Sequence, residues 1–145
     1  MKIYLAARYS RRLELCFLRD SLHAAGHQVT SRWLLGGHQW NGTAHSTADA
    51  YESGGMPAEA VRFAQDDIED IDGADVLVAF PDAPREPSTS RGGMHVELGY
   101  ALAKRKRVIV CGQRQNVFHL LPEVEYISTK QDLVMMFSNG LPEVL

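Results

Sequence analysis

The segment DVLVAFPDAPREPSTSRGGMHVELGYALAKRKRVIVCG, residues 75–112, contains two apolar runs separated by a stretch with helical spacing. The runs at 75–80 and 107–112 are nearly all apolar, which is typical of strands buried on both faces of a parallel sheet. Between them, over 92–105, four apolar residues fall on one helical face: Met94, Leu98, Ala101 and Leu102. A strand, a helix and a second strand in this order predict a crossover unit in which the two strands are parallel.

The same alternation continues on both sides of this unit. Further strands are expected at 2–6, 28–33 and 124–128, and further helices at 10–27, 58–74, 116–122 and 129–137. Five strands alternating with helices predict an α/β fold, namely a flavodoxin-like (Rossmann-like) doubly wound five-stranded parallel sheet with strand order 2-1-3-4-5. We expect one domain, residues 1–145, with its ligand at the carboxyl ends of the strands, beside the point where the strand order reverses.

Apolar spacing also predicts which helix faces are buried. In the helix at 10–27, three leucines share one face: Leu15, Leu18 and Leu22. In the helix at 58–74, the expected apolar face consists of Ala60, Val61, Ala64, Ile68 and Ile71. Residues 34–56 are rich in Gly, Ser, Thr and His and show no regular period, and a loop of this length in a small domain is usually functional or disordered.

Composition excludes several classes of protein. A net charge of −3, with 23% charged residues, does not indicate a general binder of nucleic acid polymers or of membranes. No apolar run approaches the roughly 18 residues of a membrane span. The first residues, MKIYLAARYS, become polar too early for a signal peptide, so we expect a cytoplasmic protein. Cys16 and Cys111 form no CxxC pair and the histidines lack metal-ligand spacing, so neither a disulfide nor a metal site is expected.

Glu97 interrupts the apolar helix at 92–105. It lies three residues after Met94 and four before Ala101, so it borders the buried face instead of pointing into solvent. The glycines at 92–93 let a ligand approach the backbone, and the positive end of the helix is expected to keep the carboxylate ionised. An ionised, partly desolvated carboxylate here can act as a nucleophile. The alternative is a structural acid paired with a neighbouring arginine.

Other features have both a functional and a structural interpretation. Asp67 also borders an apolar helix face, but it fits equally a solvated acidic face. Tyr4 lies in the first expected strand, where a core aromatic is the plain interpretation. The loop after that strand carries Arg8, Ser10 and Arg11 beside a helix start. This combination can bind an anionic oxygen or a phosphate, and it also fits a solvated helix start.

Together, three segments resemble the nucleoside 2-deoxyribosyltransferase family, which also includes deoxynucleoside 5′-monophosphate N-glycosidases. They are KIYLA (2–6), DDIEDIDGADVLVAF (66–80) and GGMHVELGYALAKRKRVIV (92–110), and the resemblance covers most of the chain. The last segment is the most specific because it contains the family's xELGYAL motif. By this resemblance Glu97 takes the place of the catalytic nucleophile. Asp67 takes the place of the acid that handles the proton of the base, and Tyr4 that of the tyrosine that hydrogen-bonds the nucleophile.

The resemblance also implies where the substrate is held. Residues 88–91, STSR, fall where family members contact the 5′ oxygen or a 5′-phosphate of the sugar. Transferases commonly carry an Asp six residues before the nucleophile, whereas phosphate-specific relatives carry a Ser. This chain has Arg91 there and Ser90 one step earlier, so the 5′ specificity stays open. The expected substrate-binding residues are Arg8, Ser10, Arg11, Ser88, Ser90, Arg91, Gly93 and Asn116.

The activity implied by the resemblance is cleavage of the N-glycosidic bond of 2′-deoxynucleosides. The reaction passes through a covalent glycosyl-Glu97 intermediate, and deoxyribose is transferred to another nucleobase. One alternative is hydrolysis of (deoxy)nucleoside 5′-monophosphates to free base and sugar phosphate. An alternative from another class is a non-catalytic nucleotide-binding module. Neither a metal nor an organic cofactor is implied.

The implied partners are a deoxynucleoside or deoxynucleotide, a free nucleobase and further copies of the chain. Members of the family assemble as dimers or larger homo-oligomers with shared active sites. Asn116 and His119 are candidates for residues that reach a neighbouring subunit. The loop at 34–56 can supply a lid or a base pocket, with Trp33 or Trp40 stacking on the base.

Overall fold

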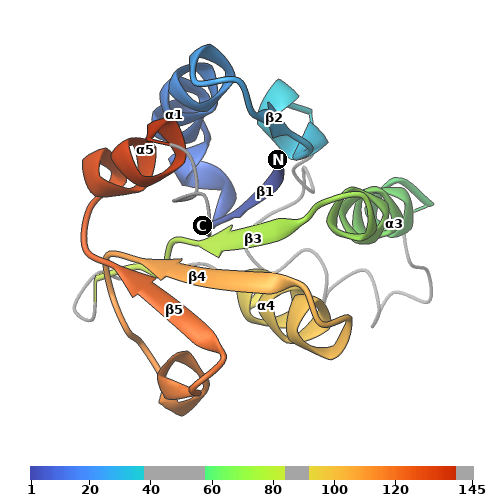
Figure 1. Ribbon diagram of the computed structural model, residues 1–145. Helices are drawn as coiled ribbons and strands as arrows, with labels where there is room; N and C mark the ends of the chain where they lie inside the picture. The colour runs from blue at the N-terminus through green and yellow to red at the C-terminus, as the bar shows by residue number, and fades with distance from the viewer. Residues whose placement is uncertain (38–57, 84–91, 140–145) are drawn as a thin grey trace.

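The computed structural model describes residues 1–37, 58–83 and 92–139, and it contains a five-stranded parallel sheet (Figure 1). The strands are β1 Lys2–Ala6, β2 Gln28–Val29, β3 Val76–Ala79, β4 Arg107–Cys111 and β5 Val124–Ile127. Their order is β2-β1-β3-β4-β5, and every neighbouring pair is parallel. The predicted α/β class and the flavodoxin-like strand order are therefore confirmed.

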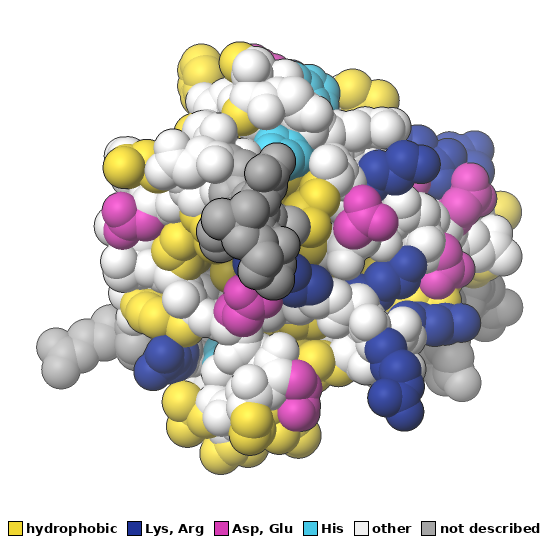
Figure 2. Space-filling model, in the orientation of Figure 1, with side chains coloured by type: hydrophobic (Ala, Val, Ile, Leu, Met, Phe, Trp, Pro, Cys, Tyr) yellow, Lys and Arg dark blue, Asp and Glu magenta, His cyan; other side chains and the backbone are white. Residues whose placement is uncertain are grey.

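Two pairs of helices cover the two faces of the sheet (Figure 1). One face carries α1 Arg12–Ala24 and α5 Lys130–Ser138, and the other carries α3 Ala58–Asp72 and α4 Gly93–Ala103. Three short 3-10 helices complete the described elements: η1 Tyr9–Arg11, η2 Arg32–Leu35 and η3 Val117–Leu120. No helix in these residues is both long and apolar enough to cross a membrane. On the face drawn in Figure 2, acidic and basic side chains are interspersed, in keeping with the small net charge of −3.

The central strands bring distant parts of the chain into register. Tyr4 of β1 lies opposite Leu77 of β3, and Leu77 lies opposite Val108 of β4. All four residues of β3 are buried, as its apolar sequence predicted. The predicted face of α1 is confirmed, because Leu15, Leu18 and Leu22 are buried. On α4, Met94, Leu98 and Ala101 are buried as predicted, and Leu102 is partly buried.

The second strand is shorter than the sequence predicted. The strand expected at 28–33 ends at Val29, and a 3-10 helix follows. The reason is that side chains of this segment, and not its backbone, form the hydrogen bonds to the outer edge of β1. The Ser31 hydroxyl accepts from the Leu5 amide at 2.7 Å, and the Trp33 indole donates to the Leu5 carbonyl at 2.9 Å. With both polar groups of Leu5 satisfied, the backbone of this segment leaves the sheet.

The buried face of α3 also differs from the predicted one. Ile71 is buried as predicted, but Val61 and Ala64 are exposed. Phe63 and Asp70, which were not predicted, are buried. Asp70 is buried because its carboxylate accepts from the Arg32 backbone N–H at 2.9 Å and from Arg32 Nε at 2.8 Å. Apolar residues alone do not define this face, since the ion pair between buried Asp70 and half-exposed Arg32 holds this side of the helix against η2.

Candidate functional site

Three side chains from three elements meet on the face of the sheet covered by α3 and α4. They are Tyr4 of β1, Asp67 of α3 and Glu97 of α4. The Tyr4 hydroxyl donates to Glu97 Oε2, although the two residues are 93 positions apart in the sequence. The same hydroxyl lies close enough to Asp67 to lower the pKa of its carboxyl group. The fold thus brings together the three residues to which the sequence assigned catalytic roles.

Each side chain is positioned by ordinary features of the fold. Tyr4 lies in the middle of a central strand and is 0% exposed, so its hydroxyl needs a partner inside the protein. α4 begins after Gly92, whose φ of +87° is a left-handed conformation that glycine adopts without strain. Glu97 follows in the second turn of α4, between the buried Met94 and Ala101, as predicted.

Burial of these groups favours their neutral forms. Burial raises the pKa of Glu97 to about 8, and the negative charge of Asp67 acts in the same direction while the Tyr4 hydrogen bond lowers it. Burial, together with the charges of Asp70 and Asp66, raises the pKa of Asp67 to about 7. The same burial and the adjacent Glu97 raise the pKa of Tyr4 well above its usual value.

The expectation that the helix end keeps Glu97 ionised is therefore wrong for the free protein. The favourable effect of the helix dipole falls off within the first turn, and Glu97 lies in the second. Loss of water around the carboxyl group is the larger effect. Because the charge of Asp67 contributes to the raised pKa of Glu97, the protonation states of the two carboxyl groups depend on each other.

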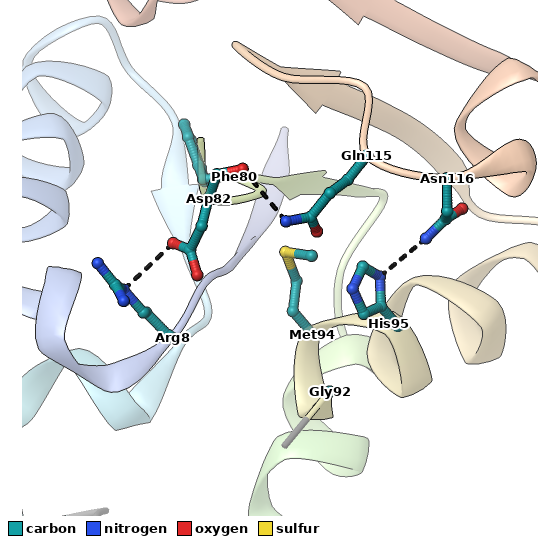
Figure 3. Close-up of a pocket in the computed structure, with 8 residues that line it drawn as sticks. All are labelled: Arg8, Phe80, Asp82, Gly92, Met94, His95, Gln115 and Asn116. Carbon is teal, nitrogen blue, oxygen red and sulfur yellow. Dashed lines mark hydrogen bonds and ion pairs between the residues drawn. The ribbon is translucent and has the colours of Figure 1, made fainter. Parts of the chain in front are cut away.

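A cavity of about 350 Å³ opens at the carboxyl ends of the central strands, beside the start of α4 (Figure 3). Its lining residues are Arg8, Phe80, Asp82, Gly92, Met94, His95, Gln115 and Asn116. They follow β1, β3 and β4 or begin α4, so the cavity lies where the reversal of strand order predicts a ligand. Glu97 is not a lining residue but comes two residues after His95 on the same helix.

Some predicted substrate-binding residues lie at this cavity. Arg8 and Asn116 line it, and Gly93 begins α4 next to the lining residue Gly92. Arg8 Nε lies 3.2 Å from a carboxylate oxygen of Asp82, so its charge is already partly balanced.

Other predicted residues lie elsewhere. Ser10 is exposed on η1. Arg11 donates to the Phe80 carbonyl at 2.8 Å and to Glu14 at 2.6 Å, so it joins η1 to the end of β3 and does not line the cavity at α4. Ser88, Ser90 and Arg91 are outside the described residues.

Two aromatic predictions are corrected by burial. Trp33 is 5% exposed and its indole N–H is bound to the Leu5 carbonyl, so it belongs to the core and offers no face for stacking on a base. His119 is 2% exposed and its Nδ1 accepts from the backbone N–H of Gln115 at 2.8 Å, so it cannot extend into a neighbouring subunit. Trp40 lies outside the described residues.

Sequence reasoning missed His95, Asp82 and Gln115 as lining residues. His95 has no metal-ligand spacing in the sequence, and the other two residues follow strands without any motif. The available signal was position, because residues just after β3 and β4 lie at the ligand-binding edge of such a sheet. Among the described residues, no group of three or more His, Cys, Asp or Glu side chains is arranged to hold a metal ion.

Three solved structures are similar to this chain over nearly its whole length. A CMP N-glycosidase from Clostridium botulinum is 20% identical, with 96% of this chain and 99% of that chain covered and a TM-score of 0.54. A 2-deoxyribosyltransferase from Bacillus psychrosaccharolyticus is 18% identical, with 92% and 90% covered and a TM-score of 0.66. A conserved protein from Enterococcus faecalis V583 is 17% identical, with 97% and 99% covered and a TM-score of 0.61.

Comparisons of sequence find no relative of this chain. No protein-family model matches the chain, and a comparison with curated proteins gives no match either. The structural likeness therefore concerns the fold: this chain has the same doubly wound sheet as a CMP N-glycosidase and a 2-deoxyribosyltransferase.

Proposed function

We propose that this protein cleaves the N-glycosidic bond of a 2′-deoxynucleoside and transfers the deoxyribosyl group to another nucleobase through a covalent glycosyl-Glu97 intermediate. The observation that carries the proposal is the meeting of Tyr4, Asp67 and Glu97 at one place in the fold. The proposal is also supported by two proteins with the same fold, one of which is a CMP N-glycosidase and the other a 2-deoxyribosyltransferase.

In the first step Glu97 attacks the sugar carbon that carries the base. A bond forms between a Glu97 oxygen and C1′, the C1′–N bond breaks, and its electron pair leaves with the base. Asp67 gives its proton to the departing base. The required state has a proton on Asp67 and none on Glu97, and the Tyr4 hydrogen bond to Glu97 favours this state because it stabilises the charged form of Glu97.

In the second step an incoming base attacks C1′ and releases Glu97. The nitrogen of that base forms the new bond, the ester bond to Glu97 breaks, and Asp67 takes the proton from the incoming base. A carboxylate close to C1′ also stabilises the positive charge that develops there in both steps. A 2′-deoxy sugar suits this chemistry because it lacks an electron-withdrawing hydroxyl next to C1′. The scheme uses no metal or organic cofactor.

The second candidate function is hydrolysis of a (deoxy)nucleoside 5′-monophosphate, with water in place of the incoming base. Arg8 in the cavity favours it, since a guanidinium group binds phosphate oxygens well. Asp82 beside Arg8 acts against it, because a carboxylate repels a phosphate. A nucleotide-binding module without turnover remains the candidate from another class.

A base-exchange assay tests these candidates together. A deoxynucleoside is incubated with a different free base, and the same is done with the deoxynucleoside 5′-monophosphate. A swapped nucleoside supports transfer, whereas free base with deoxyribose 5-phosphate supports hydrolysis. If the substrates bind without turnover in both incubations, and Glu97→Ala binds them equally well, the protein is a binding module and not an enzyme.

We also propose that the active protein is a homodimer or a larger homo-oligomer. Large apolar side chains are exposed on neighbouring parts of α4 and η3, among them Val96 at 69%, Val117 at 72% and Phe118 at 62%. Such a group of side chains is more typical of an interface than of a solvated surface. Sedimentation of the purified protein tests this, and a monomer at assay concentration would contradict it.

A further inference from the structure

The side-chain contacts of His95 fix which of its ring nitrogens carries the proton. The Asn116 amide oxygen accepts from the Phe118 backbone N–H at 2.9 Å, so the amide nitrogen is the atom turned toward His95. That nitrogen lies 3.3 Å from His95 Nδ1 and donates to it. A ring nitrogen that accepts has no proton of its own, so neutral His95 carries its proton on Nε2.

The Nε2–H group has no acceptor among the residues that the structure describes, and it belongs to a side chain that lines the cavity. Figure 3 shows the His95 ring with Nδ1 toward Asn116 and its other nitrogen on the side of Met94 and the cavity. Arg8, paired with Asp82, lies across the cavity. The Gln115 amide nitrogen donates to the Asp82 carbonyl at 3.2 Å, which leaves the amide oxygen as an acceptor. The cavity therefore offers both donors and acceptors to an oxygen-bearing group.

The proposed reaction determines which part of the substrate can lie here. Asp67 must face the departing base, and it comes from α3, which contributes no lining residue to the cavity. The part of the sugar remote from the base is the C4′ substituent, which carries the 5′ oxygen. With the base toward α3 and C1′ at Glu97, that oxygen is directed toward the start of α4 and the connection after β4, where His95 lies.

We propose that His95 is a substrate-binding residue whose Nε2–H donates to the 5′ oxygen of the sugar, and that Asn116 is the positioning residue that holds the ring in this tautomer. The inference rests on the proposed function. It applies to a 5′ hydroxyl and to a 5′-phosphate alike, because both place an oxygen acceptor at this position. It assigns a role to a histidine that has no metal-ligand spacing in the sequence.

The test compares two substrates in three variants. His95→Phe keeps an aromatic ring without a donor, and His95→Gln keeps a donor. His23→Phe is the matched control, because it makes the same change at an exposed histidine of α1, on the other face of the sheet. The substrates are a 2′-deoxynucleoside and its 2′,5′-dideoxy analogue, which lacks the 5′ oxygen. We expect His95→Phe to lower kcat/KM about three- to tenfold for the first substrate, from the net size of one neutral hydrogen bond, and to leave the second unchanged.

The controls separate binding from folding. We expect His95→Gln to recover most of the lost kcat/KM, and His23→Phe to behave as wild type with both substrates. A phosphate in place of the hydroxyl should increase the loss in His95→Phe, because hydrogen bonds to charged groups are stronger. An equal loss with both substrates, or no loss with either, would overturn the inference.

A second readout does not depend on turnover. A long-range nitrogen–proton correlation spectrum of the His95 ring should show the proton on Nε2 in wild type, and a mixture of tautomers in Asn116→Leu. Deoxyribose 5-phosphate should shift the His95 ring resonances in wild type. If no nucleoside is cleaved, the proposed function fails, while this spectrum still decides the inference. A proton on Nδ1, or no response to the sugar phosphate, would contradict it.

Discussion

Replacing Tyr4 by phenylalanine removes one hydroxyl group and leaves the packing of the ring. The ring is 0% exposed in the middle of β1, so the substitution opens little space in the core. The hydroxyl donates to Glu97 and so lowers the pKa of that carboxyl group, and the nearby hydroxyl also lowers the pKa of Asp67. Tyr4→Phe therefore raises the pKa of Glu97 above about 8 and that of Asp67 above about 7.

The size of the effect follows from the strength of a hydrogen bond to a charged group, about 1.5–3 kcal/mol. At neutral pH this lowers the fraction of molecules with ionised Glu97 by about ten- to hundredfold, since 1.36 kcal/mol is one factor of ten. Only those molecules can attack the sugar. We expect kcat/KM at pH 7 to fall by that factor, and the pH of maximal activity to rise because both carboxyl groups hold their protons longer.

The assay is kcat/KM as a function of pH for wild type and Tyr4→Phe, with release of free base as the signal. Tyr126→Phe is the matched control, because its hydroxyl donates to the Gly112 carbonyl on the opposite edge of the sheet. We expect this control to follow the wild-type profile. Unchanged activity and an unchanged optimum in Tyr4→Phe would refute the role given to the hydroxyl.

Four further substitutions test other parts of the account. Asp67→Asn removes the proton donor and should slow release of the base at least about tenfold. Glu97→Gln should raise the free energy of unfolding in urea at pH 7 by roughly 3 kcal/mol, because the folded-state pKa of about 8 exceeds the usual 4.5 and wild type loses about 1.36 kcal/mol of stability for each pH unit between 4.5 and 7. Asp70→Asn removes a charge that raises the pKa of Asp67, so the basic limb of the activity profile should move to lower pH. Trp33→Phe should cost about 1–3 kcal/mol in urea unfolding, because it leaves the Leu5 carbonyl without its indole donor.

The strand order could be predicted from sequence because the central strands are continuous apolar runs and the helices keep a regular period. The run at 75–80 is an example, and all of β3 is buried as expected. The end of β2 could not be predicted in this way. Whether the chain stays in the sheet after Val29 depends on Ser31 and Trp33 taking the polar groups of Leu5, a contact between segments far apart in the sequence.

The positions of the acidic residues in the site could be predicted from the sequence, but their protonation states could not. The spacing of apolar residues predicted that Glu97 borders the buried face of its helix. The family resemblance predicted that Glu97 acts together with Tyr4 and Asp67. The pKa of Glu97 depends on how completely α3, α4 and β1 exclude water from it, which is a property of packing and not of local sequence. His95 was missed for a related reason, since its tautomer is set by Asn116 from a distant segment.

Identification of the covalent intermediate tests the central claim most directly. Enzyme mixed with a 2′-deoxynucleoside is quenched in acid within the first turnover and analysed by peptide mass spectrometry. The account predicts a mass increase of one deoxyribosyl group on the peptide that contains Glu97, and no such increase in Glu97→Ala. Cleavage of the substrate with the sugar attached to another residue, or with no attached sugar at any quench time, would contradict it.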